Sequence, residues 1–218
     1  MPDRQLDALP YDAIQASHEL AEADPRLADV IAAVGPPTLT LRPDETLPAL
    51  LRSIVYQQLS GKAAATIHGR VLTAFGDGRQ PDAHALAAAE VEALRTCGLS
   101  RAKVAAVQDL VRRQLEGSLP ARAVLLDLDD AAIVRELTAV RGVGPWTVQM
   151  MLMFNLGRPD VWPSADLGVQ EGYRLISGAE TRPTARELAN EGERYRPWRS
   201  LAAWYLWRAV DQARAAAS

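Results

Sequence analysis

The segment AVRGVGPWTVQM, residues 139–150, decides the fold class that we expect for this chain. Apolar residues recur at helical spacing on both sides of it. Gly142 and Gly144 separate the two helical patterns, and glycine allows both a sharp backbone turn and a close approach to the peptide groups. Pro145 is suited to the first turn of the second helix. The segment therefore predicts a helix, a glycine hairpin over 139–145 and a second helix.

Two interpretations of this hairpin follow from the residues alone. In the first, amide groups at the start of the second helix point outward with the positive end of the helix dipole, which favours a phosphate. Carbonyl groups on the inner side of such a turn can also hold a monovalent cation. In the second, the hairpin is a tight corner between helices in which glycine serves only the backbone geometry. The hairpin by itself leaves both interpretations open.

The composition favours an all-α protein. Of the 218 residues, 48% are hydrophobic and 23% are charged, and alanine, leucine and arginine dominate while β-branched and aromatic residues are scarce. About ten short helices joined by tight turns are expected, with no linker between domains. A first helix over 10–21 should end near Pro25, the segment 38–43 should be a loop, and one alanine-rich helix should cover about 83–96.

The charge and the cysteine content exclude several classes of function. The net charge of −3 does not indicate a nucleic-acid binder, but phosphate affinity depends on a local basic surface rather than on the total charge. Cys97 is the single cysteine, so no internal disulfide, cysteine-ligated zinc or iron–sulfur cluster is expected. No signal peptide or membrane span is recognised, which predicts a cytoplasmic protein. Three scattered histidines lack metal-ligand spacing: His18, His68 and His84.

An aspartate follows the second hairpin helix, in WPSADLG (162–168). An acidic residue in the first turn of a helix is favoured by the helix dipole, so capping is the ordinary interpretation of Asp166. A catalytic carboxylate is the alternative. Asp160, which follows a proline, is expected in a loop or as a cap.

Two further segments carry side chains of interest. Trp204 and Trp207 are three residues apart and share one helix face, where core packing and stacking on a flat or cationic ring are both possible. The segment YQQLS (56–60) places Gln57 and Gln58 at the end of an apolar helix. These amides are either solvated or able to reach into a DNA groove.

Taken together, these segments resemble the helix–hairpin–helix, Gly/Pro-Asp (HhH-GPD) superfamily of DNA glycosylases, and most closely its 3-methyladenine DNA glycosylase II (AlkA-type) branch. The resemblance extends from about residue 45 to 210. It depends on the order of five features: YQQLS (56–60), GLSRAK (98–103), VRGVGPWTVQM (140–150), Asp166 and PWRSLAAWYLW (197–207).

The resemblance implies an all-α HhH-GPD fold with two helical subdomains that flank an active-site cleft. Residues 44–155 would form a central helical bundle that contains the hairpin, and residues 1–43 plus 156–218 would form the second subdomain. The segment before residue 45 is too short for the N-terminal β-rich domain of longer relatives, so a compact helical form is expected.

The resemblance also assigns roles around the hairpin. Main-chain amides would bind a DNA phosphate at Gly142, Gly144, Trp146 and Thr147. Main-chain carbonyls would hold a structural sodium or potassium ion at Thr138, Val140 and Val143.

Further roles follow for the catalytic site. Asp166 would be the catalytic aspartate, and Gln58 or Leu59 would be the wedge that fills the gap left by an extruded nucleotide. The base pocket would be lined by Trp146, Met150, Trp162 and Trp207.

Three departures from the family pattern qualify these roles. Trp146 occupies the position at which bifunctional relatives carry a Schiff-base lysine, so lyase chemistry is not expected. Met150 stands where some relatives have a pocket tyrosine, which leaves the substrate range open. The four cysteines of endonuclease III are missing, so the cluster-bearing branch is excluded.

The implied function is that of a monofunctional glycosylase, which removes alkylated bases such as 3-methyladenine and 7-methylguanine from double-stranded DNA in base excision repair. It would act as a monomer in the cytoplasm, on the nucleoid and away from membranes. It would use no organic cofactor. The alternatives are a non-catalytic helix–hairpin–helix module that binds DNA or senses damage, and a mismatch glycosylase.

Overall fold

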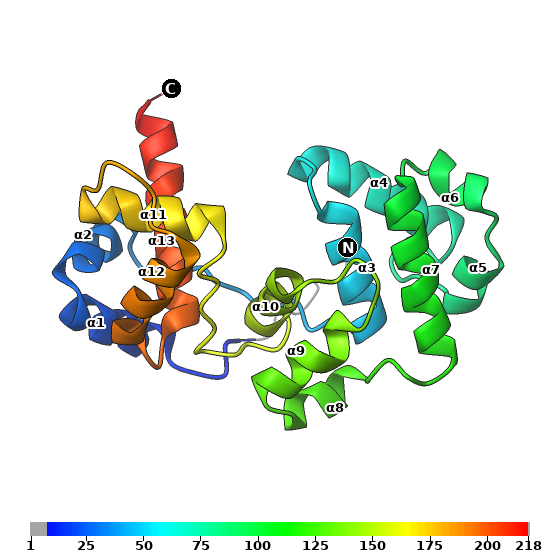
Figure 1. Cartoon of the computed structure of the whole chain (residues 1–218), viewed down its shortest axis with the longest axis horizontal. Helices are drawn as coiled ribbons and strands as arrows, with labels where there is room; N and C mark the ends of the chain where they lie inside the picture. The colour runs from blue at the N-terminus through cyan, green and yellow to red at the C-terminus, as the bar shows by residue number, and fades with distance from the viewer. Residues whose placement is uncertain (1–7, 218) are drawn as a thin grey trace. The chain divides into compact units, whose positions relative to one another are not determined.

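The computed structural model describes residues 8–217, and every regular element in this range is a helix (Figure 1). The only strand-like pairing in this range is an isolated bridge between Gly76 and Pro81. The prediction of an all-α protein is therefore confirmed. The elements are α1 (Ala13–Ala23), α2 (Pro25–Val34), α3 (Thr46–Tyr56), α4 (Gly61–Ala74), α5 (Ala83–Ala88), α6 (Val91–Thr96), α7 (Arg101–Leu115), α8 (Arg122–Asp127), α9 (Asp130–Thr138), α10 (Pro145–Phe154), α11 (Leu167–Ser177), α12 (Ala185–Glu191), the 3₁₀ helix η1 (Gly192–Tyr195) and α13 (Arg199–Ala216).

The chain forms two compact units. The first unit combines Met1–Pro43 with Leu152–Ser218, of which residues 1–7 and 218 lie outside the described range. The second unit is Asp44–Met151. One division thus lies directly before α3 and the other lies inside α10, whereas the sequence placed the second division after residue 155. In the described range, no helix has the length and apolar character that a membrane span requires.

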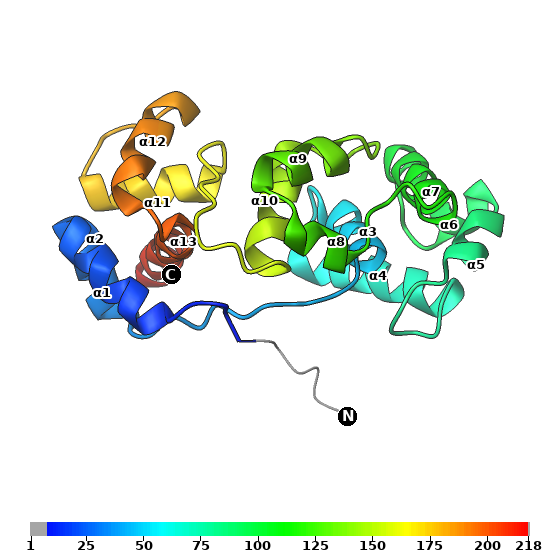
Figure 2. The same cartoon turned by 90° about the horizontal axis from the view of Figure 1, so that it is seen from below.

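Helix α13 forms the centre of the first unit. Its buried face includes Leu201, Tyr205 and Leu206, none of which is exposed to solvent. Figures 1 and 2 both show α11 beside α13. At their contact, a Cβ on Gly172 would lie 2.3 Å from the carbonyl oxygen of Leu206, so only glycine permits this approach.

Pro25 is the first residue of α2. The sequence predicted only that the first helix would end near this proline. The backbone of Asp24 ends α1 by donating to the Leu20 carbonyl at 3.1 Å. Its side chain then accepts from the Arg26 amide at 3.0 Å and so caps α2, in which Pro25 is the first residue. Proline is tolerated at this position because the first amides of a helix have no intrahelical acceptor. The helix α2 was therefore missed.

Helix α7 organises the second unit, where it contacts α3, α5 and α6. Side-chain oxygens cap the start of three helices in this unit: Ser60 caps α4, Ser100 caps α7 and Asp129 caps α9. The expected single helix over 83–96 is wrong, because an extended backbone at Ala89 and Glu90 divides it into α5 and α6. The short helix α8 was also not anticipated.

A buried carboxylate joins the N-terminal and C-terminal parts of the first unit. Asp24 is 1% exposed and accepts from the Tyr195 hydroxyl at 2.7 Å and from the Arg26 guanidinium at 2.8 and 2.9 Å. Burial by itself raises the pKa of Asp24, but these hydrogen bonds outweigh burial and lower the pKa from 3.8 to about 2. The ionised form is thus favoured in the folded state.

This low pKa predicts acid-sensitive stability. A carboxylate with a depressed folded-state pKa contributes stability above its unfolded pKa and loses it as the pH falls toward the folded value. We expect the free energy of unfolding to decrease by about 2 kcal/mol through Asp24 between about pH 5 and pH 2. Denaturant unfolding over this range would measure the decrease. The variant Asp24→Asn should lose this part of the pH dependence, and an unchanged pH profile would contradict the assignment.

Candidate functional site

The predicted hairpin lies between α9 and α10 in the second unit. Gly142 has a φ of +76°, a left-handed value that favours glycine, and the Val143 amide donates to the Val140 carbonyl at 3.1 Å to close the turn. Gly144 does not have a left-handed backbone, so the turn itself requires glycine only at Gly142. A Cβ built on Gly144 would have open space around it beyond its chain neighbours, and Gly144 is partly exposed.

The hairpin is tied to the end of α3 by a side chain to which the sequence assigned no such role. The Gln57 side-chain amide donates to the Gly142 carbonyl at 2.9 Å and to the Thr147 hydroxyl at 3.3 Å. The Lys103 ammonium donates to the carbonyls of Val55 and Gln57 at 2.7 and 2.8 Å and so caps the end of α3. The segment GLSRAK contains this lysine, but its acceptors are not evident from residue order alone.

The turn that follows α3 presents the two wedge candidates. Gln58 is exposed and has a φ of +57°, the only left-handed value of a non-glycine residue in the described range. Such a backbone is uncommon outside glycine and frequently marks a functional turn. Leu59 is a 40% exposed apolar side chain directly after it. Both candidates therefore lie on one exposed turn, next to the Gln57 contact with the hairpin.

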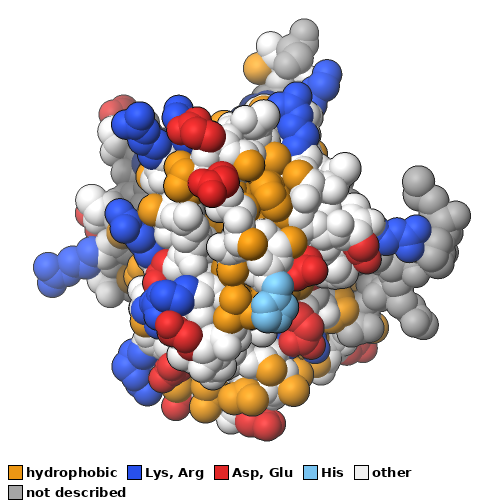
Figure 3. Space-filling view, turned by 90° about the vertical axis from the view of Figure 1, so that its right-hand side faces the viewer, with side chains coloured by type: hydrophobic (Ala, Val, Ile, Leu, Met, Phe, Trp, Pro, Cys, Tyr) orange, Lys and Arg blue, Asp and Glu red, His pale blue; other side chains and the backbone are white. Residues whose placement is uncertain are grey.

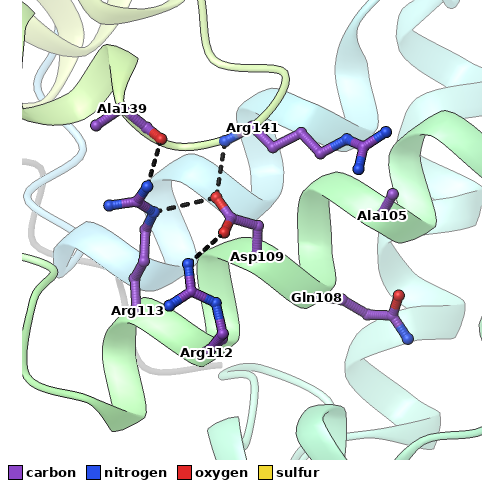
Figure 4. A pocket seen from close by; sticks show the side chains of 7 residues that line it. All are labelled: Ala105, Gln108, Asp109, Arg112, Arg113, Ala139 and Arg141. Atoms are coloured by element: carbon purple, nitrogen blue, oxygen red, sulfur yellow. Dashed lines mark hydrogen bonds and ion pairs between the residues drawn. The ribbon is translucent and has the colours of Figure 1, made fainter.

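A carboxylate of α7 supports the other side of the hairpin (Figure 4). Asp109 accepts from the Arg141 amide at 2.9 Å and from the guanidinium groups of Arg112 and Arg113 at 2.7 and 3.0 Å. Arg113 also donates to the Ala139 carbonyl at 2.6 Å. The hairpin is thus held from α3 on one side and from α7 on the other.

The predicted catalytic aspartate lies in the first unit, at the start of α11. Its Oδ1 atom accepts from the Val169 amide at 2.8 Å, so Asp166 caps this helix, as the ordinary interpretation predicted. The same oxygen accepts from the indole N–H of Trp207 at 2.8 Å. Trp207 in turn stacks on Phe154, with ring centroids 5.8 Å apart and an interplanar angle of 26°. The carboxylate of Asp166 is therefore oriented by two donors, and it remains partly exposed.

Gly168 makes this arrangement possible. A Cβ on Gly168 would lie 2.7 Å from Cδ1 of Trp207, 2.9 Å from its Nε1 and 3.0 Å from Oδ1 of Asp166. Real Cβ atoms essentially never approach a neighbour this closely, so a side chain here would displace the indole. Sequence reasoning missed this residue, although it stands in the quoted segment WPSADLG.

The other predicted pocket residues have different environments. Trp146 is 43% exposed and Met150 is partly exposed, both in the second unit. Trp162 is buried in the first unit, where its indole N–H donates to the Leu188 carbonyl at 2.7 Å. A Cβ on Gly192 would lie 2.2 Å from the Trp162 Nε1 atom, so this tryptophan is closely packed. Core packing explains these contacts of Trp162 without any ligand.

Comparison with known proteins identifies the family. The model of the HhH-GPD superfamily of base excision DNA repair proteins matches residues 51–197, which include both the hairpin and Asp166. This chain belongs to the HhH-GPD superfamily. The resemblance predicted from the sequence is thereby confirmed, and Trp207, the partner of Asp166, lies just outside the matched region.

Several HhH-GPD relatives resemble the chain over most of its length. DNA-3-methyladenine glycosylase 1 of Schizosaccharomyces pombe is 31% identical over 172 residues, which cover 79% of this chain and 75% of the relative. A structure of the 3-methyladenine DNA glycosylase of S. pombe in complex with abasic DNA has a TM-score of 0.82 at 30% identity and covers 89% of this chain and 95% of that chain. The DNA-3-methyladenine glycosidase of Bacillus halodurans has a TM-score of 0.78 at 32% identity, with coverage of 89% and 88%.

Proposed function

We propose that this chain is a monofunctional DNA glycosylase that hydrolyses the N-glycosidic bond of alkylated bases, of the 3-methyladenine and 7-methylguanine type, in double-stranded DNA. The observation that carries the proposal is the Asp166 carboxylate, which is partly exposed and fixed by the Val169 amide and the Trp207 indole. The HhH-GPD family match and the names of the relatives support the same activity in base excision repair.

The chemistry suits a single carboxylate. A base must leave the stack to be reached, and damage that weakens pairing lowers the cost of extruding it. A purine alkylated at N3 or N7 carries a positive charge and is a good leaving group, so it needs little help from a general acid. Asp166 would stabilise the cationic sugar that develops as the bond breaks and would orient the attacking water. Because the leaving group is intrinsically labile, a broad range of alkylated substrates is expected.

Aromatic side chains would contribute to recognition of the base. An electron-poor, cationic base is attracted to an aromatic face by about 0.5–2 kcal/mol. Trp207 is one candidate, because its indole donates a hydrogen bond to Asp166. The exposed Trp146 is a second candidate. Trp146 replaces the lysine that Schiff-base chemistry would require, so hydrolysis without strand cleavage is proposed.

The hairpin would hold the DNA backbone. The open space around Gly144 and the positive end of the α10 dipole favour a phosphate at the amides assigned from the family. In the turn, the Val140 oxygen already accepts from the Val143 amide, and a carbonyl has a second lone pair for an ion. We propose that the carbonyls of Thr138, Val140 and Val143 would hold a structural sodium or potassium ion.

Base release from defined duplexes tests the proposed function. Duplexes with 7-methylguanine, with a mismatch or without damage would be incubated with the protein, and abasic sites would then be cleaved with alkali. We expect alkali-dependent cleavage at the methylated purine only. Cleavage at the mismatch would favour a mismatch glycosylase, and tight binding without base release would favour a non-catalytic module. Strand breakage before alkali treatment would contradict the monofunctional mechanism.

The setting proposed for this activity is the nucleoid in the cytoplasm, with the protein acting as a monomer on damaged duplex DNA and not at a membrane. Either wedge candidate, Gln58 or Leu59, would fill the gap left by the extruded nucleotide. Size-exclusion chromatography with light scattering would give the oligomeric state with and without DNA. A stable dimer in both samples would contradict the proposed monomer.

A further inference from the structure

An open pocket of about 460 Å³ lies beside the hairpin in the second unit (Figure 4). One wall is the exposed face of α7 and the other is the backbone of the hairpin around Ala139 and Arg141. The lining residues include three arginines and one carboxylate, together with a small side chain and an amide: Arg112, Arg113, Arg141, Asp109, Ala105 and Gln108.

The single carboxylate in this pocket is committed to internal contacts. Asp109 binds the Arg141 amide and the guanidinium groups of Arg112 and Arg113. Burial by itself raises the pKa of Asp109, but these hydrogen bonds lower it to about 2, so the group is ionised at neutral pH. Arg112 is further paired with Glu116. Three guanidinium groups therefore face two carboxylates, and one positive charge is in excess.

That excess charge belongs to Arg141. Its backbone amide is used by Asp109, but within residues 8–217 its exposed guanidinium has no hydrogen-bond or ion-pair partner. Figure 4 shows the side chain extending away from Asp109, on the side of Ala105. The planar guanidinium group matches the geometry of phosphate oxygens, and the methyl group of Ala105 leaves space for a ligand.

The surroundings make a local anion site important for this chain. The net charge is −3, and the face in Figure 3 has acidic and basic side chains interspersed with apolar atoms. A uniformly basic surface is therefore not visible on this face. On such a face, affinity for a polyanion would come from individual sites at which cations outnumber carboxylates.

We propose that this pocket binds a backbone phosphate of DNA, with Arg141 as the main ligand and Arg112 and Gln108 as additional donors. The inference rests on the proposed function, and it adds a side-chain phosphate site to the one expected at the hairpin amides. Arg141 directly precedes Gly142, so the two sites would contact the same stretch of DNA backbone. The contact is independent of base identity, because it involves only phosphate oxygens.

The salt dependence of DNA binding tests this site. The affinity of the full chain for a short fluorescent duplex would be measured between about 50 and 200 mM salt. One lost phosphate contact lowers the slope of log K against log salt by about 0.9. We expect this decrease for Arg141→Gln, equally with damaged and undamaged duplexes, and retention of most of the slope for Arg141→Lys. The separate variant Gln108→Glu should bind DNA more weakly than the wild-type protein, because it places a negative charge in the pocket.

The matched control is Arg95→Gln, which removes the same charge from α6, where Arg95 pairs with Glu92. Its slope should equal that of the wild-type protein. An identical slope for Arg141→Gln and Arg95→Gln, or an unchanged affinity of Gln108→Glu, would contradict phosphate binding in this pocket. Either result would leave the proposed function intact. A wild-type protein that does not bind duplex DNA would overturn both. Thermal unfolding of each variant establishes that the fold is retained.

Discussion

Asp166→Asn should lower the single-turnover rate of base release from a 7-methylguanine duplex by about 10²–10³-fold, the usual cost of removing one electrostatic group that acts on the transition state. The neutral amide cannot stabilise a cationic sugar as a carboxylate does. In the wild-type protein, Oδ1 of Asp166 accepts hydrogen bonds from the Val169 amide and the Trp207 indole, both at 2.8 Å. The side-chain oxygen of asparagine can still accept both. The helix cap is therefore preserved, and the loss should appear in the rate and not in the stability.

The control for this variant removes an aspartate from the helix that carries Trp207. Asp211 is 53% exposed and pairs only with the neighbouring Arg208 in the described contacts. Asp211→Asn should release base at the wild-type rate. Equal rates for Asp166→Asn and the wild-type protein, with both folded, would show that this carboxylate does not carry the chemistry.

Gly168→Ala should lower base release by about 10–100-fold, because a displacement of about 1 Å in a catalytic group is enough to cost this much. The added Cβ would lie 2.7 Å from Cδ1 of Trp207, so the indole must move and its hydrogen bond to Asp166 is lost or lengthened. Helix propensity alone would make Gly168→Ala more stable than the wild-type protein, since alanine is favoured over glycine in a helix by up to about 1 kcal/mol. The expected loss of activity therefore comes from the displaced Trp207 indole and not from a less stable helix.

A second glycine provides the matched control. A Cβ on Gly69, in the middle of α4, has no neighbour within 4 Å, so Gly69→Ala should raise stability by about 0.5–1 kcal/mol and keep the activity. Trp207→Phe adds a test of the mechanism, because it retains an aromatic ring beside Phe154 and removes the N–H donor. Wild-type rates for both Gly168→Ala and Trp207→Phe would exclude a role for this contact.

The sequence specifies several features whose determining interactions are local. Ser60, Ser100 and Asp129 cap helices through amides three residues away, and a glycine with left-handed backbone marks the hairpin turn. These contacts lie within one turn of chain, so the order of residues specifies them directly. The order of the motifs also identified the family.

Pro25 illustrates where a local signal was ambiguous. A proline is compatible with the end of one helix and with the first residue of the next. The side chain of Asp24 supports the second outcome here, and it is held in place by Tyr195, 171 residues away in the chain. A contact of that separation exists only after the first unit has assembled.

The candidate site shows the same division between local and tertiary information. The sequence by itself determined the helical fold, the hairpin, the aspartate and the family to which they belong. Only the tertiary structure revealed that Gln57 contacts Gly142, that Asp109 holds Arg141 and that Gly168 leaves space for Trp207 against Asp166. Each of these depends on distances between side chains from different helices. Such distances are set by packing, which residue spacing along one chain does not specify.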